Sequence, residues 1–139
     1  MSNTDMISRD YASEITSGSM GVWSSFPAET LEDKKRLYSA TSDSKKISDI
    51  LDQYINLKDI IVETVDMANE ETGIVEPQPR VILLTDKGEA YAAISSVIMS
   101  DVKKILAYFG MPNTWEKPLK VKVSEGRSNK GRHFFHISF

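Results

Sequence analysis

Residues 80–95, RVILLTDKGEAYAAIS, are the stretch of sequence that decides the fold. Two largely apolar runs, residues 80–85 and 89–95, are separated by Asp86, Lys87 and Gly88. Glycine reaches the positive φ angles of a tight turn without a steric penalty, so this spacing is typical of a hairpin. The stretch therefore predicts two antiparallel strands.

Further strands are predicted on both sides of this hairpin. Residues 55–67, INLKDIIVETVDM, are rich in β-branched side chains and long enough to bend around a barrel. A turn or exposed loop at 69–73 and a proline-containing stretch at 76–79 follow. Residues 119–124, LKVKVS, alternate apolar with polar side chains, and residues 132–139, RHFFHISF, predict the last strand.

Residues 96–109 predict an amphipathic helix between these strands. Ser95 or Ser96 can cap its start, and Gly110 can end it. Its apolar stripe consists of Ile98, Val102, Ile105 and Phe109. The order strand, strand, strand, helix, strand, strand predicts a mainly β fold, a five-stranded OB-fold barrel over residues 55–139 with a helix between strands 3 and 4.

Two further regions precede the predicted barrel. Residues 1–20 are polar and without an apolar period, which predicts a flexible polar and acidic arm. Residues 21–54 predict an N-terminal extension of strand and helix that packs on the barrel. Within it we expect an edge strand or anchored loop at the start, a short strand at 35–40 and a helix over 43–55.

The composition favours one domain and a cytoplasmic protein. The chain has 139 residues, of which 40% are hydrophobic, enough for one core. It has no cysteine, which excludes disulfides and thiolate metal sites. Its first twenty residues lack a recognisable secretory signal, and no segment approaches the length of a membrane span, so we expect no membrane partner.

The net charge of −3 conceals a strong segregation of charge along the chain. Residues 1–33 carry six acidic side chains and one arginine, a balance of −5, whereas residues 117–139 carry a balance of +5. A protein with an acidic start and a basic end can present a cationic surface while remaining anionic overall. The net charge therefore does not exclude a nucleic-acid partner.

The alternation of strand side chains predicts which residues face solvent. The set expected to face inward is Ala90, Ala92, Ile94, Leu119, Val121, Val123, Phe135, Ile137 and Phe139. The set expected to face outward is Tyr91, Lys120, Lys122, Arg132, Phe134 and His136.

These outward residues have the chemistry of single-strand binding. Such binding needs cations along a groove to meet phosphates and exposed aromatic faces on which bases stack, at roughly 1–3 kcal/mol per base. OB-folds place this surface on strands 2 and 3, flanked by the connections between strands 1 and 2 and between strands 4 and 5. The candidate nucleic-acid-binding residues are Arg80, Lys87, Tyr91, Lys120, Lys122, Arg127, Lys130, Arg132 and Phe134.

Structural explanations for several of these residues stay open. Tyr91 and Phe134 are also suited to covering the barrel ends. Lys120 and Lys122 are also typical of edge residues that discourage pairing between sheets. Trp115 is more typical of a plug over the open end of a barrel than of a stacking residue.

Catalysis has little support in the sequence. His133 and His136 are three residues apart on a strand and therefore face opposite sides, which is unsuited to joint metal ligation. Asp59 and Glu63 are typical of solvated charges, and no glycine-rich phosphate loop occurs. We expect a non-catalytic protein with no metal or cofactor.

The chain resembles the single-stranded-DNA-binding proteins of small tailed bacteriophages. The resemblance covers residues 36–139 and includes the acidic turn that ends in Gly73, the Pro79–Arg80 strand start, the Asp86–Lys87–Gly88 turn, Trp115 and the closing basic strand. It implies binding of single-stranded DNA with little sequence preference, in phage replication or recombination in the host cytoplasm.

One alternative function remains open at this level. The same barrel could serve as a protein-interaction module that recruits or inhibits a replication protein. Single OB domains also gain affinity by forming homo-oligomers or by binding cooperatively on DNA, so self-association is a further expectation.

Overall fold

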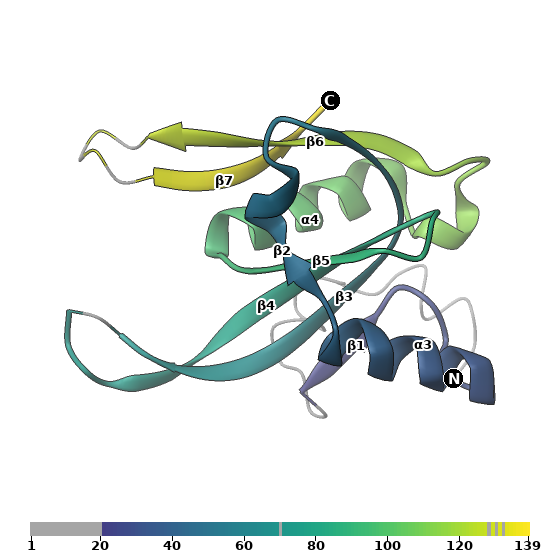
Figure 1. Ribbon diagram of the computed structural model, residues 1–139, viewed down its shortest axis with the longest axis horizontal. Helices are drawn as coiled ribbons and strands as arrows, with labels where there is room; N and C mark the ends of the chain where they lie inside the picture. Colours follow the sequence, from purple (N-terminus) through teal and green to yellow (C-terminus); the bar gives the residue numbers. More distant parts are fainter. Residues whose placement is uncertain (1–20, 70, 128, 130, 132) are drawn as a thin grey trace.

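A computed structural model describes residues 21–69, 71–127, 129, 131 and 133–139 (Figure 1). One curled sheet forms a half-barrel, and helices cover parts of its two faces. The elements in chain order are β1 (Val22–Ser24), α3 (Leu31–Ser42), β2 (Lys45–Lys46), the short 3-10 helix η1 (Ile47–Ile50), β3 (Tyr54–Ala68), β4 (Val75–Thr85), β5 (Ala90–Ile94), α4 (Ser96–Phe109), the 3-10 helix η2 (Pro112–Thr114), β6 (Leu119–Arg127) and β7 (His133–Ser138).

The long strand β3 organises this sheet because it pairs with three other strands. Its first residues pair antiparallel with β6, its centre pairs with β1, and the part from Leu57 to Ala68 pairs with β4. β5 pairs with β4 and β7 with β6, while β2 lies parallel to β5. A register shift between Leu57 and Asp59 marks a bulge, which bends the strand and increases its twist.

Most of the predicted strands and the second predicted helix are confirmed. The helix covers Ser96–Phe109 as predicted, with Ser95 Oγ accepting a hydrogen bond from Ile98 N (3.1 Å) and Gly110 at a φ of 77°. The proline-containing stretch 76–79 belongs to β4 and is not a loop. In the described part of the sheet β5 pairs with β2 and not with β7, so the observed architecture is a curled half-barrel.

The predicted strand at 35–40 and the predicted helix over 43–55 are both wrong. The first lies inside α3, whose start is fixed by Thr30 Oγ1 accepting from Asp33 N (3.1 Å). The second region contains β2 and η1, and Asp52 has a φ of 62°, which no helix contains. Pairing with the sheet prevails over the helical spacing here, because Asp52 N donates to the carbonyl of Val123 (2.7 Å).

The main hydrophobic core lies between the sheet and α4. It takes one face of β3, β4, β5 and β6, together with Ile98, Val102 and Ile105 of α4. Its most fully buried members are Ile47, Leu57, Ile60, Val81, Leu83, Ile98, Val102, Val121 and Val123. Trp115 packs against this core, as the predicted plug would. The predicted burial of Phe109 in the apolar stripe and the predicted inward orientation of Phe139 are wrong, because these residues are 46% and 62% exposed.

A second core on the opposite, outer face of the sheet fixes the N-terminal extension. Phe26 and Ala40 are buried there against three sheet residues, and Leu37 of α3 packs on the same cluster. The three sheet residues are Ile61, Ile82 and Leu84. The extension therefore shares a core with the sheet.

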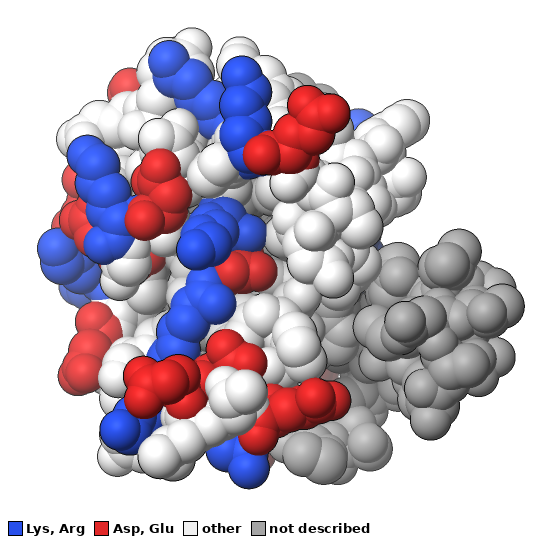
Figure 2. Space-filling model, turned by 90° about the vertical axis from the view of Figure 1, so that its right-hand side faces the viewer, with Lys and Arg blue, Asp and Glu red and all other residues white. Residues whose placement is uncertain are grey.

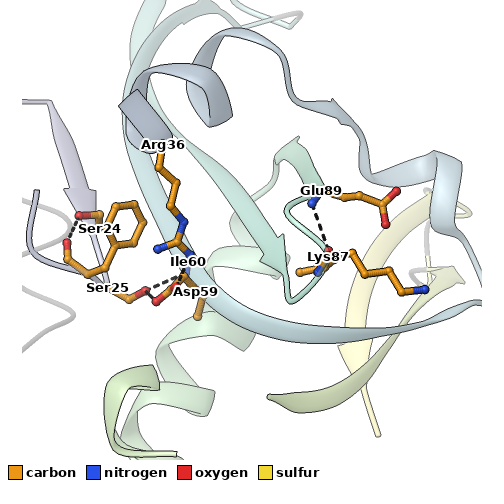
Figure 3. Close-up of polar contacts among 9 residues, drawn as sticks. Ser24, Ser25, Arg36, Asp59, Ile60, Lys87 and Glu89 are labelled. Atoms are coloured by element: carbon orange, nitrogen blue, oxygen red, sulfur yellow. Dashed lines mark hydrogen bonds and ion pairs between the residues drawn. The ribbon is translucent and has the colours of Figure 1, made fainter. Parts of the chain in front are cut away.

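A buried ion pair joins α3 and β3 beside this second core (Figure 3). Asp59, which is 7% exposed, accepts hydrogen bonds from Arg36 and from Ser25 Oγ (2.9 Å). The Arg36 guanidinium also lies 4.2 Å from the centre of the Phe26 ring. Glu63 forms a similar pair with Arg80. The prediction that Asp59 and Glu63 are solvated charges is therefore wrong.

Neither of the described α-helices, α3 and α4, has the length and apolar character needed to cross a membrane.

The Arg36–Asp59 pair predicts a large loss of stability when one partner is removed. Arg36→Met leaves the Asp59 carboxylate buried, and losing one member of a buried pair costs roughly 3–5 kcal/mol. Because the Arg36 side chain is 33% exposed, we expect a cost of about 3 kcal/mol in the free energy of unfolding, measured in urea. The control Lys35→Met removes a 64% exposed side chain and should cost less than about 0.5 kcal/mol. Equal stabilities for the two variants would contradict this assignment.

Candidate nucleic-acid interface

The outer face of β4 and β5, where an OB-type ligand is expected, is largely covered. Ile82 and Leu84 of β4 are buried in the second core, and Ala90 and Ala92 of β5 pack against it. These side chains are apolar or small because α3 packs on them. This part of the predicted binding surface is therefore interior.

The predicted outward orientation of Tyr91 is wrong. Tyr91 lies opposite Leu83 in the β4–β5 ladder, and both side chains belong to the main core. Tyr91 is 6% exposed, and its hydroxyl donates to Glu89 Oε2 (3.0 Å). Burial raises the pKa of the Tyr91 phenol, and the hydrogen bond to Glu89 adds to the rise. The ring offers no free face for a base.

Ala90, Ala92 and Ile94 were predicted to face the barrel interior, and they lie on the other face of β5. Ala90 and Ala92 pack towards α3, while Ile94 is 44% exposed beyond the end of that helix. Because α3 packs on the outer face, both faces of β5 are apolar. Alternation alone therefore assigned these residues to the wrong face.

Arg80 holds the extension in place. Its guanidinium is paired with Glu63 and Ser44, and it donates to the carbonyl of Thr41 (3.2 Å) at the end of α3. These partners are all within the protein, and the side chain is only 21% exposed. Its observed role is structural.

Two predicted lysines lie together on the outer face of β6, around an exposed tyrosine. Tyr54 of β3 lies opposite Lys122, and Asn56 lies opposite Lys120. Lys120 Nζ is 4.8 Å and Lys122 Nζ 5.7 Å from the centre of the ring of Tyr54, a residue that is 54% exposed. Cation–π attraction favours both ammonium groups beside this one aromatic ring.

The same outer face continues along β6 and β7 to two more rings. Phe134 lies opposite Gly126 and His136 lies opposite Ser124, and the two ring centres are 6.1 Å apart. The Phe134 ring lies directly over Gly126, where a Cβ would be 2.6 Å from Cζ. We call this surface the lysine–tyrosine platform, consisting of Tyr54, Lys120, Lys122, Phe134 and His136.

Two more predicted cations lie outside the platform. Lys87 is in the β4–β5 turn, which is fixed to β3 because Asp86 N donates to the carbonyl of Asn56 (3.1 Å). Arg127 is exposed at the end of β6, but it lies opposite His133 and therefore on the other face of the β6–β7 hairpin. Lys130 and Arg132 lie outside the described residues. The structure thus groups Lys120, Lys122 and Phe134 on one sheet face, with Lys87 beside it, while Arg80, Tyr91 and Arg127 lie elsewhere.

A second open region lies between the two hairpins that project from the same side of the molecule (Figure 1). It is a groove of about 840 Å³ between the β3–β4 ribbon and the start of β7. The residues lining it are Met67, Ala68, Asn69, Glu71, Gln78, Ile94 and His133. The ribbon is acidic, with Asp66, Glu71 and Glu76. Carboxylates repel phosphates, so the platform is the better site for a nucleic acid.

On the face of the molecule shown in Figure 2, the described charges do not form a single basic field. Figure 2 shows one face of the molecule, on which lysine and arginine side chains are interleaved with acidic ones. Among the described ion pairs, Lys45 Nζ lies 3.7 Å from Glu89 Oε2. Such interleaving favours a local contact surface over general attraction of anions.

Tyr54 is the functional candidate that the sequence analysis missed. Tyr54 falls within the helix predicted over 43–55, whereas the structure places it at the start of β3. The sequence contains a signal for this position, because Tyr54 and Asn56 alternate with the apolar Ile55 and Leu57. Such alternation indicates a strand with Tyr54 on its outer face.

No metal site is formed by the part of the chain that the structure describes, where no group of three or more His, Asp or Glu side chains is suitably placed. His133 forms a 2.6 Å contact with Glu125 through Nδ1, while His136 lies beside Phe134 on the platform. The two histidines therefore face opposite sides of β7, as predicted.

Comparison with known families gives a match that covers most of the chain. The family described as phage single-stranded DNA-binding protein matches residues 16–139. No curated protein and no solved structure matches the chain.

The Phe134 ring lies so close to Gly126 that any side chain at position 126 must displace the ring. Gly126→Ala should lower the free energy of unfolding by about 1 kcal/mol, since the ring tip must shift to admit the methyl group. In a Phe134→Ala background the same substitution should be neutral or stabilising by about 0.5 kcal/mol, because alanine is favoured over glycine in a strand. Urea unfolding of the four proteins measures the coupling. Equal effects of Gly126→Ala in the two backgrounds would place the ring elsewhere.

Proposed function

This chain belongs to the family of phage single-stranded DNA-binding proteins, and from this we propose that it coats exposed strands of phage DNA during replication or recombination. We further propose that it binds with little sequence preference, catalyses no reaction and needs no cofactor. Its place of action is the cytoplasm of the host cell.

The lysine–tyrosine platform is the observation that supports this proposal most strongly. Lys120 and Lys122 are two residues apart on β6 and share one face, so their Cα atoms are roughly 7 Å apart. Two cations at this spacing can meet phosphates of an extended strand, while Tyr54 offers a ring face to a base. Stacking and phosphate contacts accept any base, which is consistent with low sequence preference.

The proposed architecture is an OB-type barrel with an added extension. The antiparallel pairs β3–β4, β4–β5, β3–β6 and β6–β7 support it. In this proposal residues 55–139 are the barrel, residues 21–54 the extension and residues 1–20 an arm. Since α3 covers the outer face of β4 and β5, the DNA contacts move to β3, β6 and β7.

A second candidate function is supported by the β3–β4 ribbon. Met67, Ile74 and Val75 are 43%, 58% and 63% exposed there, beside the acidic side chains of the ribbon. Exposed apolar residues near charges are typical of protein contacts, either with a replication protein or between copies on DNA. A protein complex that persists in high salt and is not displaced by oligonucleotides would favour this function over DNA binding.

Removing the two platform lysines tests the proposed DNA site. In Lys120→Gln/Lys122→Gln we expect affinity for a labelled oligothymidine to fall about tenfold at low salt, measured by fluorescence anisotropy. The slope of log affinity against log salt should become shallower by about 1.4, because each phosphate contact on a single strand contributes about 0.7. The control Lys34→Gln/Lys35→Gln removes two charges from α3 and should leave the slope unchanged. Equal slopes in both variants would exclude the platform, and an unmodified protein that binds no oligothymidine would exclude the function.

Tyr54 predicts a separate effect that depends on its ring. Tyr54→Ala should lower oligothymidine affinity by about 1–3 kcal/mol, whereas Tyr54→Phe should retain most of it, because stacking needs the ring and not the hydroxyl. Tyr38→Ala is a matched control, since Tyr38 is 74% exposed on α3. If Tyr38→Ala and Tyr54→Ala have the same affinity, Tyr54 is not a stacking residue.

A further inference from the structure

Three exposed aromatic side chains lie together where the chain ends. Tyr108 is 80% exposed, Phe139 62% and Phe109 46%. The Phe109 and Phe139 ring centres are 5.5 Å apart, and the ring planes are tilted by 46°. A shallow pocket of about 240 Å³ lies among the three rings, with Lys104 in its wall. We call Lys104, Tyr108, Phe109 and Phe139 the C-terminal aromatic patch.

The backbone that carries the patch is held firmly. Gly110 ends α4, and its N–H donates to the carbonyl of Leu106 (3.0 Å). Trp115 Nε1 donates to the carbonyls of Phe109 (3.0 Å) and Gly110 (3.2 Å). The last turn of α4 is therefore anchored by an indole that itself packs on the main core. The exposed rings are presented by an ordered element.

The patch adjoins the lysine–tyrosine platform across the edge of β7. Ser138 lies opposite Lys122 in the β6–β7 ladder, and Phe139 is the next residue. β7 is the last strand in the path β2-β5-β4-β3-β6-β7. A flexible chain that crosses Lys122 can pass round this edge and reach the rings.

We propose that the C-terminal aromatic patch is a second stacking subsite, which receives bases of a single strand that leaves the platform round the edge of β7. This subsite rests on the proposed function and extends it, because it lengthens the path of the bound strand beyond β6. The residues that contact bases are Tyr108, Phe109 and Phe139, and Lys104 meets a phosphate beside them.

The charges at the patch favour a base inside the pocket and a phosphate at its rim. Asp101 lines the pocket, and its Oδ2 accepts a hydrogen bond from Ile137 N (2.8 Å). A carboxylate repels a phosphate but not a neutral base. Lys104, also in the pocket wall, is exposed and supplies the opposite charge. Aromatic rings near a cation, continuous with a cationic sheet face, are the features of single-strand sites.

Truncating the two most exposed rings tests the subsite without disturbing the platform. In Tyr108→Ala/Phe139→Ala we expect affinity for an oligothymidine of about 16 nucleotides to fall about tenfold or more. Affinity for one of about 5 nucleotides should change less than twofold, because the platform alone accommodates it. The Tyr38→Ala control should match the unmodified protein at both lengths. Unchanged affinity for the longer oligonucleotide would overturn the subsite, as would equal losses at both lengths.

Trp115 provides a second and independent measurement. In a Trp23→Phe variant all tryptophan emission comes from Trp115, whose indole N–H is hydrogen-bonded to the carbonyl of Phe109. The longer oligonucleotide should change this emission, and the shorter one should leave it nearly unchanged. No change with the longer one, despite measured binding, would overturn the subsite while the proposed function stands. Unchanged DNA binding with a smaller sedimenting mass in Tyr108→Ala/Phe139→Ala would instead assign the patch to self-association.

Discussion

The buried carboxylate of Asp59 is the constraint on which the arrangement of this protein depends. A charge on the outer face of a β-strand would ordinarily be solvated, but here it is covered by Phe26 and α3 and must be paired. Arg36 and Ser25 supply the partners from the helix and from the segment after β1. Burying this carboxylate therefore requires both pieces of the extension in one place, and Arg80 with Glu63 fixes the far end of α3 in the same way.

The position of α3 in turn decides which surface is left for a ligand. Its coverage of β4 and β5 makes Ile82 and Leu84 core residues and leaves the outer face of β6 and β7 without a described helix on it. On that face lie the rings and ammonium groups of the platform, and beyond β7 lies the C-terminal aromatic patch. The proposed path of single-stranded DNA follows from this division of one sheet into a covered and an uncovered part.

The fold could be predicted from the sequence where local signals and packing agree. The glycine turn at Gly88, the serine cap at Ser95 and the alternation in 119–124 each specify an element that tertiary contacts reinforce. The helix prediction for residues 43–55 was wrong because two tertiary contacts outweigh the helical spacing of the apolar residues. These are the hydrogen bond from Asp52 N to the carbonyl of Val123 and the burial of Ile47. The outward orientation of Lys120 and Lys122 could be predicted from the alternation of β6 alone. The orientations of Tyr91 and Arg80 could not be predicted in this way, because they depend on which face of the sheet α3 covers. The packing of α3 on the sheet is a long-range contact.

The most direct test of the central claim is to map the DNA contact by amide chemical shifts in ¹H–¹⁵N spectra, with oligothymidine added at low salt. The account predicts that the largest shifts cluster at residues 54–56 of β3, along β6 and β7, and at the end of α4, with little change in α3. Shifts confined to the acidic β3–β4 ribbon and the groove beside it, with β6 unaffected, would contradict it.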